Sequence, residues 1–319
     1  MRSTAAILAT LLAVATPFLT AATLRGFNGQ AACQPTLSCE TFPVPPFSVP
    51  LNPGNTGDEV KILQFMLQRG QYPACSSVNI TGTFDSITRE CLTQFQAGTG
   101  LPSTGTLTSR TACQVVMQLQ PDGYKDDGKP ASAYGRLYKV VIPVHRNRSI
   151  ESVAQLQQAD GTVAHEFTVR LHGFDFLAQN ANTWPSFNSS GCGMSPFASN
   201  GDTPTGLYDF DLNSPEPIPK EYGSWPVNRA VRGREGNAAF ILPQFRYGIL
   251  MHTGEWAQYS SWTPPKPMPN SEGCIHAYPE DIQKVASLLE SWGVVANKNP
   301  FGEQPYPFQP QGILSVYEL

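Results

Sequence analysis

A cysteine and a histidine that could act together lie in the C-terminal third of the chain. Cys274 follows Gly273, and His252 lies 22 positions upstream of the cysteine. A thiol attacks an acyl carbon once a neighbouring base takes its proton, and backbone N–H groups can stabilise the oxyanion that forms. The sequence therefore predicts a cysteine acyl-transfer site with Cys274 as nucleophile, His252 as base, and the amides of Gly273 and Cys274 as oxyanion donors.

Each of these residues alone has a more ordinary explanation. A histidine near a strand end is usually a satisfied polar residue, and a cysteine in an exported protein is usually half of a disulfide. A thiol with a reference pKa of about 8.5 also needs help to ionise at neutral pH. The combination favours catalysis, because His252 closes an expected strand and Gly254 leaves room for a substrate backbone.

The cysteine count and the N-terminus indicate an exported chain. Seven cysteines predict three disulfides and one free thiol, and Cys274 is the candidate for that thiol. The alternatives are an inert buried thiol, or a Cys274 that pairs while another cysteine is free. Arg2, an apolar stretch and small residues near Ala22 predict a signal peptide over residues 1–22. An uncleaved membrane anchor is the alternative.

The composition excludes several classes of function. The formal net charge is -4 and no run of basic residues occurs, so we expect no nucleic-acid partner. No glycine loop for phosphates and no zinc framework is recognisable, so we expect neither a cofactor nor a metal. With 29 prolines and 27 glycines, turns should outnumber long helices.

Changes in composition divide the mature chain into four parts. Residues 23–52 form a Pro-rich tether, and residues 120–134 form a polar linker rich in glycine and proline. Between them, residues 53–119 predict a small unit of three helices, and residues 135–319 predict a mainly β domain. The fold class expected is therefore α+β with more than one domain.

Local signals place the elements of both domains. Apolar residues at helical spacing over residues 57–67 end at Gly70, and Asp85 and Thr108 are plausible N-caps of two further helices. Three cysteines suggest stapling of this unit: Cys75, Cys91 and Cys113. Strands are expected over residues 137–144, 163–171, 238–242, 247–251 and 313–316. A helix should begin at Pro279.

The helical unit resembles the type 1 peptidoglycan-binding domain. The motifs that carry the resemblance are Gly57…Val60…Leu63-Gln64…Leu67…Gly70, then Gly82-Thr83-Phe84-Asp85…Thr88, then Phe95-Gln96…Gly100-Leu101, Gly105 and Thr111. The resemblance implies a module that holds cell-wall glycan-peptide and does no chemistry. Any small helical bundle is the alternative, since amphipathic helices are common.

The β domain resembles the L,D-transpeptidase catalytic domain. The motifs are Gly201-Asp202-Thr203-Pro204-Thr205-Gly206, His252-Thr253-Gly254 and Ser271-Glu272-Gly273-Cys274-Ile275, in that order. The resemblance implies a β-sandwich-like fold in which Cys274 is acylated by a peptidoglycan stem peptide. It also implies that His252 is the base and that the Thr253 carbonyl orients it. The donor would be a diamino acid in the third position of the stem.

The chain departs from this family at positions that bear on substrate binding. His276 stands where arginine or asparagine is common, and could bind substrate, tune the thiol or be structural. The loop over residues 255–270 is long and proline-rich, and could be a lid or surface packing. We nominate His276, Ser271, Gly254 and Trp256 as substrate-binding residues.

Two other features near the motifs invite an explanation. An insertion over residues 186–193 brings in Cys192, which suggests a disulfide. Arg229, Arg232 and Arg234 could hold a substrate carboxylate, although a solvated face explains most of them better.

Three functions fit these residues. The first is an L,D-transpeptidase-like cysteine acyltransferase, and the second is an L,D-carboxypeptidase or endopeptidase that uses the same acyl-enzyme with water. The third is a peptidoglycan-recognition protein without turnover, which has no need of the Cys274–His252 pair. We expect peptidoglycan as the partner and a monomer that is extracellular or cell-wall associated. No membrane contact is expected after signal cleavage.

Overall fold

The computed structural model describes residues 46–173, 195–255, 268–299 and 305–319. The predicted signal peptide, most of the tether and the insertion with Cys192 lie outside these residues. No helix of the described residues is long and apolar enough to cross a membrane.

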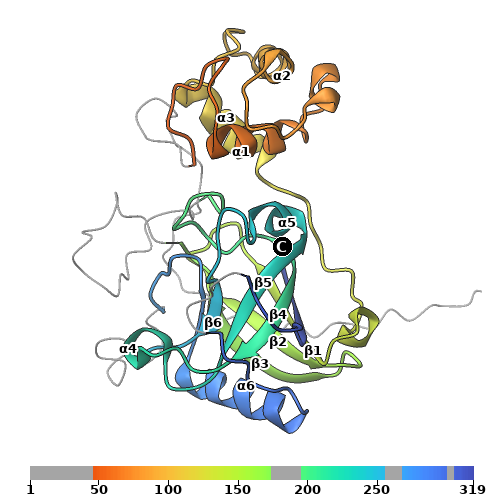
Figure 1. The fold of residues 1–319 in the computed structure, drawn as a ribbon, viewed down its shortest axis with the longest axis vertical. Coiled ribbons are helices and arrows are strands. Elements are labelled where there is room, and N and C mark those ends of the chain that lie inside the picture. Colours follow the sequence, from red (N-terminus) through yellow and green to blue (C-terminus); the bar gives the residue numbers. More distant parts are fainter. Residues whose placement is uncertain (1–45, 174–194, 256–267, 300–304) are drawn as a thin grey trace, which may run out of the picture. The chain divides into compact units, whose positions relative to one another are not determined.

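Three helices form the N-terminal module, as the sequence predicts (Figure 1). They are α1 (Asp58–Leu67), α2 (Ser86–Gly98) and α3 (Ser109–Leu119), with the short 3₁₀ helix η1 (Pro73–Ser77) between the first two. Both expected N-caps are confirmed: the Asp85 side chain accepts from the Thr88 amide, and the Thr108 hydroxyl accepts from the Thr111 amide. These caps fix where α2 and α3 begin.

Two buried glutamines hold the turns that lead into these caps. Gln64 accepts from the amides of Thr81 and Gly82 at 2.9 Å and donates to the Thr83 carbonyl at 2.9 Å. Gln96 makes the equivalent contacts further along the chain, accepting from Gly105 and donating to the Thr106 carbonyl. Each glutamine lies in one helix and pins the turn before the next, so the module is stabilised by polar contacts as well as by its small apolar core.

A disulfide joins η1 to α2 in this module. Cys75 pairs with Cys91, which lies on the buried face of α2. Cys113 in α3 is also disulfide-bonded. The expected stapling of the module is therefore confirmed.

The predicted linker lies along the C-terminal domain. The Asp122 carboxylate accepts from the Thr205 hydroxyl and from the Asn237 amide, both at 2.6 Å. A short 3₁₀ helix, η2 (Ala131–Tyr134), follows and leads into the first strand. Asp122 thus fixes the start of the linker to the residues beside the Thr-Pro-x-Gly motif.

Eight strands of the described residues close into a barrel. They are β1 (Tyr138–Val144), β2 (Ser152–Gln158), β3 (Val163–Arg170), β4 (Gly206–Asn213), β5 (Val227–Glu235), β6 (Leu250–His252), β7 (Ile275–Ala277) and β8 (Gly312–Glu318). Their order around the barrel is β1-β2-β3-β7-β6-β5-β4-β8, which returns to β1. The mainly β character is confirmed, but the strands form one closed sheet in which every strand has two neighbours, so the structure is a barrel and not clearly the expected sandwich of two sheets.

The barrel closes through its shortest strands. β7 pairs with β3 antiparallel and with β6 parallel, through two residue pairs on each side. A strand of three residues carries too little periodicity to be read from a sequence. The pattern of the sequence therefore could not predict that the sheet closes.

Two expected strands differ from the structure. Residues 238–241 belong to the helix α5 (Gly236–Ile241), in which Ala238 and Ile241 are buried, and Leu242 is its C-cap. A short apolar run fits a buried helical turn as well as a strand, and the Asp122 contact to Asn237 favours the helix here. The strand expected over residues 247–251 begins only at Leu250, after Gly248 with φ 72°.

The long helix of the C-terminal domain begins where it was expected. α6 (Pro279–Ser291) buries Ile282, Val285 and Leu289 in the core. Asp281 in its first turn also bonds to His165 of β3 at 2.9 Å. The helix therefore anchors the segment that directly follows the candidate nucleophile (Figure 1).

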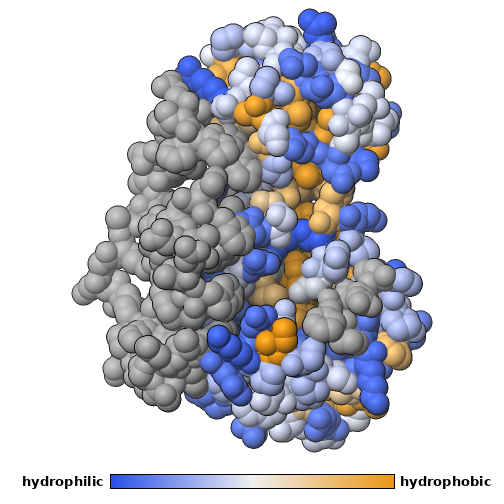
Figure 2. All heavy atoms as spheres, turned by 60° about the vertical axis from the view of Figure 1, so that its left-hand side comes forward, coloured by the Kyte–Doolittle hydropathy of each residue, from blue (hydrophilic) through white to orange (hydrophobic). Residues whose placement is uncertain are grey.

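Figure 2 shows hydrophobic residues on one face in separate groups among polar ones. Single exposed apolar side chains such as Tyr247 and Val295 are normal for a folded protein.

We expect replacement of Gln64 by leucine to destabilise the helical module. Leucine keeps the volume but leaves the Gly82 amide without the Gln64 acceptor and removes one of the bonds made by the Thr81 amide and one of those made by the Thr83 carbonyl, which should together cost about 3 kcal/mol. Amide hydrogen exchange of the full chain should then show protection in α1 and α2 lowered by roughly 100-fold.

Gln118→Leu is the matched control, because Gln118 is an exposed residue of α3 that bonds only along its own helix. Equal protection in Gln64→Leu and Gln118→Leu would show that the buried glutamine does not hold the turn.

Candidate active site

Pairing between β6 and β7 brings the candidate nucleophile and base together. The two strands are parallel, with Met251 opposite Ile275 and His252 opposite His276. Side chains alternate along a strand, so the residues next to Met251 and Ile275 point away from the core that those two fill. Cys274, His276 and His252 therefore lie on one face of two strands about 4.8 Å apart.

Hydrogen bonding sets the tautomer of the His252 ring. Nδ1 lies 2.6 Å from the Thr253 carbonyl. A carbonyl only accepts, so Nδ1 carries the proton and Nε2 is left with the lone pair that a base needs. This is the contact that the resemblance implied for Thr253. Burial lowers the pKa of His252 to about 4, against the opposing effect of the Thr253 and Glu221 carbonyls.

Cys274 is the free cysteine of the described residues, as predicted. It is partly exposed, and its Sγ lies 3.6 Å from the Gly248 carbonyl. Burial of the sulfur raises the pKa of the thiol to about 11, while the Leu250 amide and nearby arginines act in the opposite direction. The resting pair is thus a neutral thiol beside a neutral imidazole.

The turn before Cys274 is held by its own polar groups. The Ser271 hydroxyl donates to the Cys274 carbonyl at 2.7 Å and accepts from the Gly273 amide at 3.1 Å. The Thr203 hydroxyl donates to the Gly273 carbonyl at 2.9 Å. The predicted oxyanion donor Gly273 is therefore engaged by Ser271, and an oxyanion would have to share or displace that contact. Ser271, nominated for substrate binding, braces the turn.

Arg246 lies behind this turn, and the sequence did not predict it as a site residue. Its guanidinium is buried and donates to four backbone carbonyls: those of Pro196, Gly201, Asp202 and Glu272. Gly273 has φ 99°, and a Cβ built on it would collide with Arg246 Nη2. Glycine is thus required at position 273 both by its backbone conformation and by the arginine packed against it.

His276 and Tyr222 complete the surroundings of the His252 ring. The His276 ring meets the His252 ring edge-on, with centroids 4.8 Å apart, and its Nδ1 lies 2.8 Å from the Pro269 carbonyl. Tyr222 is the last residue of α4 (Pro219–Tyr222), and the centroid of its ring lies 5.2 Å from the centroid of the His252 ring. Burial lowers the pKa of His276 well below its usual value, so both imidazoles are neutral at neutral pH.

The three arginines of β5 have different environments. Arg229 is fully buried and donates to Glu216 at 2.5 Å, so the expectation of a solvated face is wrong for this residue. It lies in register with Leu250 of β6, on the face that carries Cys274. Arg232 and Arg234 instead contact the Asp209 carboxylate. Neither of these two lies near the thiol.

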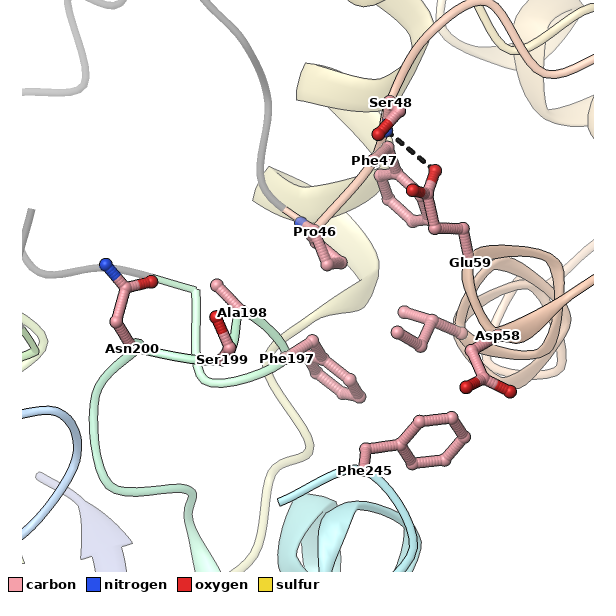
Figure 3. A pocket seen from close by; sticks show the side chains of 11 residues that line it. Pro46, Phe47, Ser48, Asp58, Glu59, Phe197, Ala198, Ser199, Asn200 and Phe245 are labelled. Carbon is pink, nitrogen blue, oxygen red and sulfur yellow. Dashed lines mark hydrogen bonds between the residues drawn. The ribbon is translucent and has the colours of Figure 1, made fainter. Parts of the chain in front are cut away.

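The remaining nominated residues are placed in part. Gly254 is buried directly after Thr253, and Trp256 lies outside the described residues. The pocket in Figure 3 is lined by Pro46, Phe47, Ser48, Asp58, Glu59, Ile62, Phe197, Ala198, Ser199, Asn200 and Phe245. None of these is a residue nominated for chemistry. Asp202 and Thr203 were recognised only as a motif, and no local signal distinguished Arg246.

Two segments of the chain match models of known protein families. Residues 56–115 match the model of a peptidoglycan binding domain, and residues 178–296 match the L,D-transpeptidase catalytic domain. The chain carries a peptidoglycan-binding domain followed by an L,D-transpeptidase catalytic domain. The matched L,D-transpeptidase segment includes all three motifs around Cys274. Together the two domains support an enzyme that acts on peptidoglycan.

Comparison with other proteins adds little to this. No curated protein matches the chain. One solved structure is a fused Zn-dependent amidase/peptidase/peptidoglycan-binding domain-containing protein from Clostridium acetobutylicum, at 12% identity and a TM-score of 0.23. The match covers 84% of this chain and 99% of that one. A likeness at that level carries no argument about the L,D-transpeptidase domain.

The lowered pKa of His252 predicts a stability that falls in acid. His252 binds a proton below about pH 6.5 in the unfolded chain, whereas in the folded chain it binds one only below about pH 4. Stability is therefore fully retained above pH 6.5 and falls by up to about 3 kcal/mol as the pH drops towards 4. Urea unfolding between pH 7 and pH 4 measures this loss.

Variants separate this contribution from the rest of the acid response. His252→Gln should show a shallower loss over the same pH range, and His145→Gln, which lies outside the site, should follow the parent protein. A loss of stability that is equally steep in His252→Gln would mean that the buried ring is not the group that titrates.

Proposed function

We propose that this protein is an exported L,D-transpeptidase-like enzyme that transfers peptidoglycan stem peptides through a thioester on Cys274. One observation carries the proposal. The free Cys274 and the buried His252 lie on one face of β6 and β7, inside the segment that matches the catalytic domain. The histidine tautomer leaves Nε2 as the base.

The first half of the reaction forms the acyl-enzyme. Cys274 Sγ attacks the carbonyl carbon of the third stem residue, and its proton passes to His252 Nε2. The tetrahedral intermediate collapses with cleavage of the peptide bond to the fourth residue, whose amine leaves with the proton from His252. We assign the stabilisation of the oxyanion to the Cys274 amide, since it belongs to the attacking residue itself.

The second half releases the enzyme. An amine of a neighbouring stem attacks the thioester carbon, His252 accepts its proton, and the thiolate leaves and is reprotonated. A new amide forms and Cys274 is restored. The neutral resting pair suits this cycle, because His252 can accept and return one proton in each half-reaction.

The helical module supplies the second part of the proposal. Its match to a peptidoglycan binding domain supports a role in holding the enzyme on the wall polymer while the barrel acts on the stems. Export is supported by the Cys75–Cys91 disulfide and by the N-terminal signal pattern. The proposed location is extracellular or cell-wall associated.

Replacement of Cys274 by alanine should abolish product formation and leave binding intact. Incubation of the mature protein with muropeptides, followed by mass spectrometry, should give new cross-linked dimers that Cys274→Ala does not produce. Sedimentation with purified sacculi should recover the parent protein and Cys274→Ala equally, because the helical module is unchanged.

Other products would redirect the proposal. Shortened stems without dimers would make water the acceptor and the protein a carboxypeptidase or endopeptidase. Unchanged muropeptides, with sacculus binding retained, would leave a peptidoglycan-recognition protein and overturn the catalytic assignment.

A further inference from the structure

We propose that Arg246 is a positioning residue for the nucleophile. Its guanidinium fixes the turn of Gly273 and Cys274, and its positive charge stabilises the Cys274 thiolate as it forms. The inference deepens the proposed function and rests on Cys274 as the nucleophile. Arg246 lies outside the three motifs of the L,D-transpeptidase domain.

The Arg246 guanidinium makes four hydrogen bonds to backbone carbonyls. Nη1 donates to the carbonyls of Pro196 at 2.7 Å and Asp202 at 2.8 Å, and Nη2 donates to Gly201 at 2.9 Å and Glu272 at 3.0 Å. One planar fork thus joins the segment before the Thr-Pro-x-Gly motif to the residue two positions before the nucleophile. Three of the four bonds go to the first segment and one goes to Glu272, so a relative movement of the two segments would break at least one of them.

The second feature of Arg246 is the fit of its guanidinium against Gly273. Nη2 occupies the space that a side chain at position 273 would need. The left-handed backbone of Gly273 and the Nη2–Glu272 bond therefore depend on one another. Because Gly273 is bonded directly to Cys274, the orientation of the nucleophile follows from this packing.

The third feature is its charge. All four acceptors of Arg246 are carbonyls, whereas Arg229 on the same side of the barrel donates to the Glu216 carboxylate. The carboxylates of Asp202 and Glu272 act on the Arg246 guanidinium through their charge, and the bonds that Arg246 makes to these two residues go to their backbone carbonyls. A buried cation held by dipoles keeps more of its field than one in an ion pair, and that field is weakly screened in the interior.

The groups that face the thiol come from several elements. Arg246, which lies between α5 and β6, and Arg229 of β5 lower the pKa of Cys274, and Glu272 of its own loop raises it. Tyr222 of α4 faces the thiol, and its pKa is raised to about 12, so it is neutral. His252 of β6 is neutral above about pH 4, and His276 of β7 is also neutral. Arg246 is thus the cation that remains in direct contact with the nucleophile turn.

The test measures the thiol itself and needs no peptidoglycan. Iodoacetamide reacts with the thiolate, which displaces iodide and forms a thioether. The rate of alkylation of the Cys274 peptide in the mature protein is followed against pH by mass spectrometry. Turnover of muropeptides and thermal unfolding are measured on the same variants.

Two substitutions of Arg246 separate its charge from its geometry. In Arg246→Gln, the alkylation midpoint should rise by about one pH unit, so that the rate at a fixed pH below the midpoint falls by about tenfold. In Arg246→Lys the charge remains but the fork is lost, so the midpoint should stay near that of the parent while turnover falls at least tenfold.

Two further variants act as controls. Glu272→Gln removes an exposed negative charge, so its midpoint should move to lower pH. Arg232→Gln removes an arginine that is bonded to Asp209 at the surface and should leave the midpoint unchanged.

Several results would overturn the inference. These are a folded Arg246→Gln with the parent midpoint, an Arg246→Lys with full turnover, or failure of both to fold, which would assign Arg246 to the fold alone. An alkylation profile that shifts as expected, in a parent protein that never turns over muropeptides, would instead remove the proposed function and leave the electrostatic role of Arg246 standing.

Discussion

The parallel pairing of β6 with β7 is the constraint on which the candidate site depends. It joins segments separated by a long loop through only two residue pairs, Met251 with Ile275 and His252 with His276. Met251 and Ile275 are buried in the core, so a shift of β7 by one residue would turn Cys274 and His276 inward and away from the face that carries His252. The register that keeps the core apolar is therefore also the register that assembles the chemistry.

Neighbouring segments hold the short pairing of β6 with β7 in register. α6 follows β7 directly and is anchored by its buried face, so β7 is fixed at its C-terminal end. At the other end, the bonds of Ser271, Thr203 and Arg246 hold the turn before Cys274. Rigid support from both sides is what a nucleophile needs, because small displacements of a reacting atom cost large factors in rate.

The sequence predicts the local parts of this structure well and the non-local parts poorly. Caps, helices and the contact between His252 and the Thr253 carbonyl follow from short motifs. Closure of the barrel depends on β7, whose three residues carry no pattern, so the residues alone predicted only a mainly β domain, and the sandwich-like fold was an expectation from the family resemblance. Arg246 stands in a polar-looking loop beside Tyr247, which is exposed, and only the fold reveals that its guanidinium is buried.

The electrostatics of the site bear on how the thiol is activated. With a pKa of about 4 for His252 and about 11 for Cys274, transfer of the proton at rest would cost on the order of 10 kcal/mol before the attraction between the two charges is counted. A stable thiolate–imidazolium pair is therefore disfavoured in the free enzyme. Proton transfer becomes favourable as the sulfur bonds to carbon and its charge moves to the oxyanion, so general-base assistance within the attack step fits this site better than a thiolate formed in advance.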